Sequence, residues 1–352
     1  MRTVDWDSAN AQVKLIDQRR LPGSLVVLSF SRYQDLVEAI RNMTVRGAPA
    51  IGVTAAFGVV LAAWYATPPT LEEARREIKK AMELLRASRP TAVNLFWALD
   101  RIHQVAEAPY ENMDALRRAL LAEAQRMAEE DVATNRQMAM HGAALIEDGD
   151  TIIHHCNTGA LAAVDWGTAL GCIRMAHEQG KRIHVLVDET RPRLQGARLT
   201  AWELEQYGIS YEIICDSAAG AFLRGGKVQK VFFGADRVAA NGDVANKIGT
   251  YMLSLAAHAN GVPVIAVMPL STIDLQTPHG GMIPIEERDP AEVLNLQING
   301  EPVAPKGARA RNPAFDVTPH TLISAWVTER GVITPPFDVH FQAILEAGSK
   351  PN

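Results

Sequence analysis

The sequence predicts an α/β protein in two parts: a mainly helical N-terminal domain with a short β lead, and a C-terminal domain built on a parallel sheet. Two observations support this prediction. Residues 33–145 are mostly Ala, Leu, Glu and Arg at helical spacing, and from residue 150 onward β-branched runs alternate with amphipathic runs. We therefore expect domains at 1–145 and 146–352, each close to the usual size of ~100–200 residues.

The first part begins with an extended segment and continues as helices. The stretch "VKLIDQRRLPGSLVVLSF" at 13–30 has the apolar content of strands and is interrupted by the turn formers Pro and Gly. The stretches "LEEARREIKKAMELLRAS" at 71–88 and "ALRRALLAEAQRMAEEDVATNRQMAMHGAALI" at 115–146 carry apolar residues at helical spacing. This order predicts a short sheet followed by long helices.

The second part alternates strands with helices. We expect strands in "TIIHHC", "RIHVLVDE", "SYEIICDS", "KVFFGAD" and "PVIAVMP", and helices in "VDWGTALGCIRMAHEQG", "GARLTAWELEQYG" and "ANKIGTYMLSLAAHANG", each ending at or just before Gly. This alternation predicts a Rossmann-like parallel sheet that helices cover on both faces. The tail after 285 is rich in turn formers and predicts returning loops that pack on the sheet edge.

Composition excludes several classes of protein. A net charge of −5 argues against a surface that binds the phosphates of nucleic acids. The charged N-terminus has no apolar centre, so it does not resemble a signal peptide, and we find no uninterrupted apolar run of the ~18 residues that a membrane span needs. Three cysteines without a C-x-x-C pair indicate neither a disulfide framework nor a zinc ribbon, and a reducing cytoplasm is the expected setting.

Chemically useful side chains follow the predicted strands. In a parallel α/β sheet the residues after the carboxyl ends of the strands face the ligand crevice. A thiol and several carboxylates there suggest acid–base chemistry, although each residue singly is more typical of a cap or a turn than of a catalyst. The residues at these ends are Cys156, Asp188 with Glu189, Asp216 with Ser217, and Asp236.

Two histidines precede Cys156 and leave alternatives open. Strand alternation puts His154 and Cys156 on one face and His155 on the other. A metal pair or a Cys–His nucleophile is conceivable, but we expect a histidine that is hydrogen-bonded near the crevice. Cys172 and Cys215 are expected to be small core residues rather than reactive thiols.

Arginine and lysine at helix starts indicate anion binding. Arg46 and Gly47 precede Ala48 and Pro49, and Pro favours the first helical position, where free backbone N–H groups attract anions. The same device recurs where Arg89 precedes Pro90. In "GADRVAANGDVANK", Asn246 and Lys247 are expected to open the helix after Asp236, with Lys247 as a flexible charge for phosphate. No strand is followed by G-x-G-x-x-G, so a nicotinamide site is not predicted.

Five of these motifs together carry a family resemblance. In order and spacing, "VRGAPAIG", "SRPTAVNL", "HCNTGALA", "DETRPRLQGARLTAWEL" and "GADRVAANGDVANKIGTY" resemble the S-methyl-5-thioribose-1-phosphate isomerase family, over nearly the whole chain. Its superfamily includes ribose-1,5-bisphosphate isomerases and the alpha, beta and delta regulatory subunits of translation initiation factor 2B, a guanine nucleotide exchange factor. The resemblance implies a homodimer and a sugar-phosphate substrate, without a metal or another cofactor.

The resemblance also assigns roles to residues. It implies that Cys156 of "CNTG" and Asp236 of "GADR" are the catalytic pair. The substrate contacts that it implies are Arg46, Gly47, Ala48, Arg89, Gln195, Asn246 and Lys247.

The implied reaction converts 5-methylthio-α-D-ribose 1-phosphate into 5-methylthio-D-ribulose 1-phosphate, a step of methionine salvage. Phosphate on C1 prevents simple ring opening, so the ring oxygen must receive a proton, and Asp236 is the expected donor. Cys156 acts either as the base for the C2 proton or as a stabiliser of a hydride shift. Two other functions stay open: isomerisation of another 1-phosphorylated pentose, such as 5-deoxyribose 1-phosphate or ribose 1,5-bisphosphate, and a non-catalytic sugar-phosphate or nucleotide sensor in an exchange factor.

Overall fold

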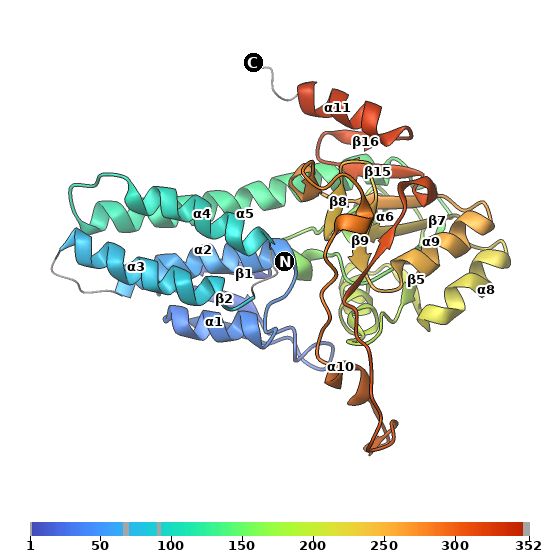
Figure 1. The fold of residues 1–352 in the computed structure, drawn as a ribbon, viewed down its shortest axis with the longest axis horizontal. Coiled ribbons are helices and arrows are strands. Elements are labelled where there is room, and N and C mark those ends of the chain that lie inside the picture. Colours follow the sequence, from blue (N-terminus) through green and yellow to red (C-terminus); the bar gives the residue numbers. More distant parts are fainter. Residues whose placement is uncertain (1, 66–69, 90–92, 348–352) are drawn as a thin grey trace. The chain divides into compact units, whose positions relative to one another are not determined.

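The computed structural model describes residues 2–65, 70–89 and 93–347 (Figure 1). The chain forms two compact units. Unit 1 comprises Met1–Thr134 together with Gly159–Gly167, and unit 2 comprises Asn135–Thr158 together with Thr168–Asn352. A short loop that follows Cys156 in the sequence therefore belongs to unit 1, which the sequence pattern did not indicate.

Unit 1 opens with a three-stranded antiparallel sheet. Its strands, in sheet order, are β1 (Val4–Asp7), β2 (Gln12–Ile16) and β3 (Val27–Phe30). In β2, Val13 and Leu15 are buried and Lys14 is exposed, which is the alternation expected of a half-buried strand. The predicted β lead is confirmed by β2 and β3, and β1 adds a strand before it.

The helices of unit 1 pack around one apolar helix. They are α1 (Tyr33–Arg41), α2 (Ala48–Tyr65), α3 (Leu71–Arg86), α4 (Val93–Glu107) and the first part of α5 (Met113–Ala143). In Figure 1, α2 lies among α1, α3 and α4, and it contacts all three. Helix α3 begins where the Thr70 hydroxyl accepts the Glu73 N–H at 3.2 Å, which satisfies a backbone donor at the start of the helix.

The prediction that the chain has no apolar run of ~18 residues was wrong, because helix α2 is 18 residues long and contains no charged residue. Among the described residues it is the one helix that is long and apolar enough to cross a membrane. However, 78% of this segment is buried inside the protein, as in the core helix of many globular domains. Its apolar character is thus accounted for by packing within unit 1.

Unit 2 is built on a seven-stranded sheet in the order β16-β15-β10-β7-β4-β5-β6. All neighbouring strands are parallel except the β15–β16 pair. The strands are β4 (Thr151–His154), β5 (His184–Asp188), β6 (Ser210–Ile214), β7 (Lys230–Gly234), β10 (Val264–Val267), β15 (Ala325–Thr328) and β16 (Gly331–Ile333). The five predicted strands and their parallel pairing are confirmed.

The helices between these strands end as predicted. They are α6 (Ala169–Glu178), α7 (Ala201–Tyr207), α8 (Ala219–Arg224) and α9 (Thr250–Ala259). Gly180, Gly208 and Gly261 follow α6, α7 and α9, and each has a positive φ that glycine adopts without strain.

One prediction for the second part was wrong. Asn246 and Lys247 do not open a helix, because they end the strand β9 (Val244–Lys247). This strand lies in a small sheet of order β11-β8-β9-β14, with β8 (Arg237–Ala239), β11 (Ile273–Asp274) and β14 (Phe315–Thr318). Antiparallel pairing with β8 and β14 therefore overrides the helical pattern around Asn246.

The tail contains regular elements as well as loops. Beyond β14, β15 and β16 it forms α10 (Ala291–Leu294), the hairpin of β12 (Gln297–Ile298) and β13 (Glu301–Pro302), and α11 (Phe337–Ala347). Trp326 of β15 is fully buried, and its ring centroid lies 4.6 Å from that of Phe337. The tail thus completes the core of unit 2 instead of only covering the sheet edge.

Close packing between the end of α5 and α6 gives a stability prediction. A Cβ at Gly142 would lie 2.2 Å from the Cys172 Sγ and 2.8 Å from its Cβ, so we expect Gly142→Ala to lower the free energy of unfolding by about 1–3 kcal/mol. Urea denaturation measures this change. Gly307→Ala is the control, because nothing lies within 4 Å of the position that a Cβ would take there.

Removing the sulfur tests the cause of this loss. Cys172→Ala in the Gly142→Ala background should recover part of the lost stability, since the nearest clash is with Sγ. Equal stability of Gly142→Ala and Gly307→Ala would contradict the packing argument.

Candidate active site

Cys156 lies in a sharp turn just after β4. Its backbone has φ of 68°, in the left-handed region that non-glycine residues rarely adopt. Its side chain is 7% exposed. Strained conformations of this kind persist where the surrounding structure holds them, and they concentrate at functional sites.

Two threonine hydroxyls hold this turn. The Thr190 Oγ1 accepts the Cys156 N–H at 3.0 Å and donates to the Asp188 backbone O at 3.0 Å. The Thr200 Oγ1 donates to the Cys156 backbone O at 2.8 Å. Both backbone groups of Cys156 therefore have side-chain partners in place of the β-ladder that ends at His154.

The next residue anchors the turn further. The Asn157 Nδ2 donates to the Glu203 Oε1 at 2.8 Å and to the Thr200 Oγ1 at 3.1 Å, in buried surroundings. The Tyr207 hydroxyl donates to the second oxygen of Glu203 at 3.2 Å. This chain of contacts ties Cys156 to the π-helical turn Gly196–Thr200 and to α7.

Gln195 is the predicted site residue that contacts the thiol. Its Nε2 lies 3.5 Å from the Cys156 Sγ. Its Oε1 is buried and has no hydrogen-bond partner among the residues that the structure describes. Gly196 follows, and any side chain there would strike the Asp188 backbone O, 1.8 Å from a Cβ. Gln195 is thus held against the sulfur with one acceptor unsatisfied.

Asp236 follows the strand next to β4. β7 and β4 pair in parallel, with His154 opposite Phe232, so Cys156 and Asp236 come after the ends of adjacent strands. The Asp236 N–H donates to the Ala245 O at 2.9 Å, which fixes the aspartate backbone against β9.

Asn246 and Lys247 lie on β9 in the same unit. The Asn246 Nδ2 donates to the Thr250 Oγ1 at 3.0 Å, and the Lys247 Nζ donates to the Ala314 O at 2.8 Å. The Lys247 ammonium also lies 4.5 Å from the centroid of the Phe315 ring. An ammonium group carries three N–H donors and a positive charge, which is the chemistry that phosphate binding uses.

The remaining predicted contacts belong to unit 1. α2 begins at Ala48, one residue before the predicted start at Pro49. Gly47 has φ of 91°, and a Cβ there would lie 2.2 Å from the Ala162 O, so only glycine fits against the loop Gly159–Gly167. Arg46 is half-buried.

Arg89 is also half-buried and ends the described stretch 70–89. The predicted helix start at Pro90 lies outside the described residues, and α4 begins at Val93.

The loop after Cys156 is tied into unit 1 by hydrogen bonds. The Thr3 Oγ1 donates to the Ala160 O at 2.6 Å, and the Gln18 Nε2 donates to the Leu161 O at 2.6 Å. The Thr3 N–H donates to the Val164 O at 2.9 Å.

The two histidines before Cys156 are buried and hydrogen-bonded, as expected. The His154 Nε2 lies 2.9 Å from the Thr158 Oγ1. Burial lowers the pKa of His154 to about 3, so this ring stays neutral. The His155 Nδ1 lies 2.7 Å from the Asp188 Oδ2, and its Nε2 lies 3.0 Å from the Ile248 O.

One group of side chains has the composition of a metal site. Donor atoms of His155, Asp188 and Asp216 lie within 4.8 Å of one another. The two Asp216 oxygens accept the backbone N–H groups of Thr190 and Arg191 at 2.7 Å, and both His155 nitrogens are engaged. The His155 and Asp216 atoms and the Asp188 Oδ2 therefore already serve in hydrogen bonds, whereas the Asp188 Oδ1 is buried without a hydrogen-bond partner among the described residues.

The other two cysteines differ from each other. Cys172 on α6 is fully buried, and burial raises the pKa of its thiol, which confirms the predicted core role. The same prediction for Cys215 was wrong, because Cys215 is exposed. It follows β6, an edge strand of the seven-stranded sheet that the described residues form.

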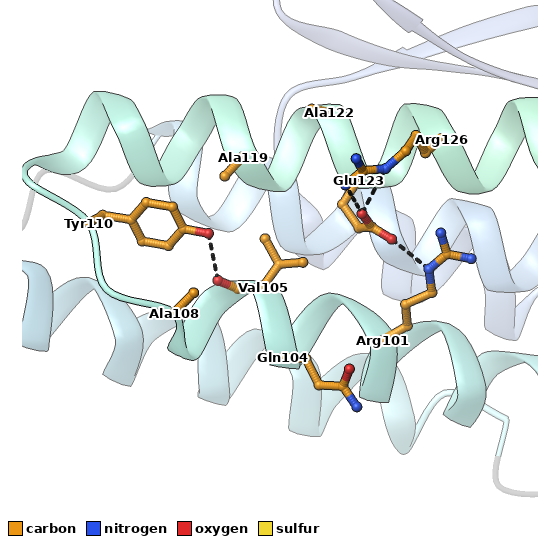
Figure 2. Close-up of a pocket in the computed structure, with 9 residues that line it drawn as sticks. All are labelled: Arg101, Gln104, Val105, Ala108, Tyr110, Ala119, Ala122, Glu123 and Arg126. Atoms are coloured by element: carbon orange, nitrogen blue, oxygen red, sulfur yellow. Dashed lines mark hydrogen bonds and ion pairs between the residues drawn. The ribbon is translucent and has the colours of Figure 1, made fainter.

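A separate pocket lies between α4 and α5 in unit 1 (Figure 2). It has a volume of about 620 Å³. Arg126 donates to Glu123 at 3.0 Å, Arg101 contacts the same carboxylate, and the Tyr110 hydroxyl donates to the Val105 O at 2.9 Å. Its two arginines both pair with Glu123 and it contains none of the predicted site residues, so we assign it no catalytic role.

Comparison with known proteins identifies the class. The model of the initiation factor 2 subunit family matches residues 44–335, and the chain belongs to this family. The structure described as translation initiation factor eIF-2B, subunit delta, from A. fulgidus is 41% identical, with a TM-score of 0.90 over 98% of this chain and 99% of that chain.

Further relatives narrow the class to one branch. Methylthioribose-1-phosphate isomerase 2 of Pseudothermotoga lettingae is 49% identical over 346 residues, which are 98% of this chain and 99% of that protein. The crystal structure of 5-methylthioribose 1-phosphate isomerase from Pyrococcus horikoshii is 45% identical, with a TM-score of 0.92 over 98% of this chain and 96% of that chain. Within the family, the chain therefore groups with the methylthioribose-1-phosphate isomerases.

The threonine that supports Cys156 gives a prediction. Thr190→Val keeps the shape of the side chain but leaves the Cys156 N–H buried without its acceptor, so we expect a loss of about 1–3 kcal/mol in the free energy of unfolding. Thr190→Ser retains the hydroxyl and is the control. Denaturant unfolding compares the two, and equal stability would contradict the role of this hydrogen bond.

Proposed function

We propose that this protein is an aldose–ketose isomerase that converts 5-methylthioribose 1-phosphate into 5-methylthioribulose 1-phosphate, as the names of its relatives indicate for those proteins. The observation that carries the proposal is the strained turn at Cys156, beside the strand that leads to Asp236. A buried thiol and a carboxyl group at adjacent strand ends supply the two groups that this isomerisation requires.

The chemistry assigns a task to each catalytic residue. The C1–O4 bond breaks, O4 gains a proton, hydrogen moves from C2 to C1, and the C2 hydroxyl becomes a carbonyl as it loses its proton. Asp236 protonates O4, and Cys156 acts at C1 and C2, as base for the C2 proton or as stabiliser of a hydride shift. Asp236 must therefore be protonated in the complex. The residue is exposed in this structure, so the proposal requires bound substrate to cover the carboxyl group and favour its neutral form.

Substrate binding is proposed for seven residues. Two structural features support members of unit 2: the unsatisfied Gln195 Oε1 is suited to accept a sugar O–H, and the Lys247 ammonium is suited to phosphate. In unit 1, the backbone at Gly47 and the start of α2 suit an anion. The proposed contacts are Arg46, Gly47, Ala48, Arg89, Gln195, Asn246 and Lys247.

A regulatory role is the second candidate, favoured by the likeness to the eIF-2B delta subunit structure. Retention of both Cys156 and Asp236 argues against it, because a subunit that only senses a ligand has no need of a catalytic pair. Another 1-phosphorylated pentose as substrate is the third. Turnover with a panel of sugar phosphates separates the three, since a sensor binds without turnover.

The proposal also covers the domain organisation, the oligomeric state and the cellular location of the enzyme. We propose a helical domain at about 1–145 and a Rossmann-like catalytic domain at about 146–352; the strand order of the parallel sheet supports the second assignment, while the compact units divide after Thr134 and place Gly159–Gly167 with the helical part. A homodimer is supported by exposed apolar side chains on α9, namely Tyr251, Met252 and Leu255. A cytoplasmic location is supported by three free cysteines.

The catalytic pair gives the first functional prediction. Cys156→Ala and Asp236→Asn should each bind substrate about as well as the wild type while turnover falls by about 10²–10⁴-fold, because each removes a group that acts on the reacting atoms. Cys156→Ser should restore little activity, since a hydroxyl is a much weaker acid than a thiol. Steady-state kinetics and calorimetric binding measure both effects.

The exposed Cys215 supplies the matched control for the thiol. Cys215→Ala should turn over like the wild type. A folded Cys156→Ala variant with a rate within a few-fold of the wild type would reduce Cys156 to a packing residue.

The phosphate contacts give the second functional prediction. Lys247→Ala and Arg89→Ala should each weaken substrate binding by about 10- to 100-fold, because each removes a charged hydrogen-bond donor worth roughly 1.5–3 kcal/mol. The exposed Lys227 and Arg224 provide control substitutions to Ala. Isothermal titration with substrate and with inorganic phosphate makes the comparison, and wild-type affinity in both variants would place the phosphate site elsewhere.

A further inference from the structure

His155 and Asp188 form a buried pair that the proposed chemistry does not use. Their side chains are 1% and 2% exposed, and the Nδ1–Oδ2 distance is 2.7 Å. The other ring nitrogen, Nε2, faces the Ile248 O at 3.0 Å. A backbone carbonyl only accepts hydrogen bonds, so Nε2 must carry a proton.

The other ring nitrogen of His155, Nδ1, shares a hydrogen bond with Asp188, and the proton in this bond decides the charge of the pair. Burial by itself would lower the pKa of His155, but the hydrogen bond and charge of Asp188 outweigh burial and raise this pKa to about 9. Burial also raises the pKa of Asp188, but the hydrogen bond and the charge of His155 oppose that shift. We therefore take the pair as an imidazolium and a carboxylate at neutral pH.

Charged and titratable groups surround this ring on several elements. Cys156 follows β4, Asp188 ends β5, Asp216 follows β6, and Asp316 lies on β14. The neutral His154 is the other neighbour. The imidazolium is thus the positive centre of a group of acidic side chains.

The ring also joins two segments of the candidate site. His155 directly precedes Cys156, while Ile248 directly follows the proposed substrate residues Asn246 and Lys247. A Cβ at Gly249 would lie 2.9 Å from the His155 Cε1, so the backbone there is packed against the ring. From the other side, the Asp316 Oδ2 accepts the Gly249 N–H at 2.8 Å.

We propose that His155 and Asp188 are positioning residues of the isomerase, a charged pair that fixes the Cys156 turn against the segment 246–249 and keeps a positive charge beside the thiol. This inference rests on the proposed function. A purely structural role is the alternative. A buried ion pair is weak evidence for stability, because apolar replacements are often as stable, so a role in orienting the site explains its presence better.

Asp188→Asn tests the charge with little change of shape. The amide can still contact Nδ1, but without the carboxylate, burial makes His155 neutral at pH 7.5. We expect kcat to fall about tenfold or more at pH 7.5, since small errors in positioning cost that much. The wild-type kcat should fall as pH rises through about 9, where His155 loses its proton. The variant should lack this limb.

A second histidine–carboxylate pair, between β5 and β6, is the matched control. The His184 Nε2 lies 3.2 Å from the Glu212 Oε2, with Glu212 largely exposed. Glu212→Gln should keep the wild-type kcat and pH profile. If folded Asp188→Asn keeps kcat within about twofold and retains the limb near pH 9, the proposal is overturned.

Two further measurements test the proposed role of His155 and Asp188 if Asp188→Asn does not fold, or if the wild type does not use the proposed substrate. Imidazole ¹⁵N NMR of the wild-type protein should show both His155 nitrogens protonated at pH 7.5, and a single N–H there would overturn the proposal. If the wild type does not turn over 5-methylthioribose 1-phosphate, the proposed function fails on its own.

If the wild type does not turn over this substrate, the rate at which iodoacetamide modifies Cys156, measured in a Cys215→Ser background, tests the positioning role of the pair. It should be about fivefold or more slower in Asp188→Asn than in Glu212→Gln, because a nearby cation favours the reactive thiolate. Equal rates would overturn the proposal.

Discussion

The left-handed backbone of Cys156 is the constraint on which the candidate site depends. A thiol-bearing residue with φ of 68° is stable only because the hydroxyls of Thr190 and Thr200 bind its N–H and C=O groups. The same turn ends β4 and brings the sulfur within 3.5 Å of the Gln195 Nε2. Loss of either hydroxyl would let the backbone relax, so the position of the thiol is determined by residues that do no chemistry themselves.

The parallel sheet explains why these groups meet in one unit. β4 lies between β5 and β7, so the loops after all three strands emerge at the same edge. The β5 loop provides Thr190 and Gln195, and the β7 loop provides Asp236. Asp216, after the edge strand β6, orders the β5 loop by accepting two of its backbone N–H groups. Carboxylates that resemble catalysts in the sequence are thus divided between structural and proposed chemical roles.

Local patterns were sufficient for much of the fold but not for the support of the site. The five strands were predictable because each carries its own β-branched run, and glycine marked the helix ends. By contrast, Thr190 and Thr200 lie 34 and 44 residues from Cys156, and no local pattern reveals such contacts. Asn246 was predicted in a helix because its strand depends on pairing with distant β14. The catalytic and binding roles of the motif residues stay predictions.

The central claim is that the Cys156 turn presents its thiol to the substrate. Peptide mass spectrometry after brief alkylation, with and without saturating 5-methylthioribose 1-phosphate, tests this most directly, with the exposed Cys215 as internal reference. We expect bound substrate to slow the modification of Cys156 and to leave the modification of Cys215 unchanged. Modification of Cys156 at the same rate with and without bound substrate would contradict it.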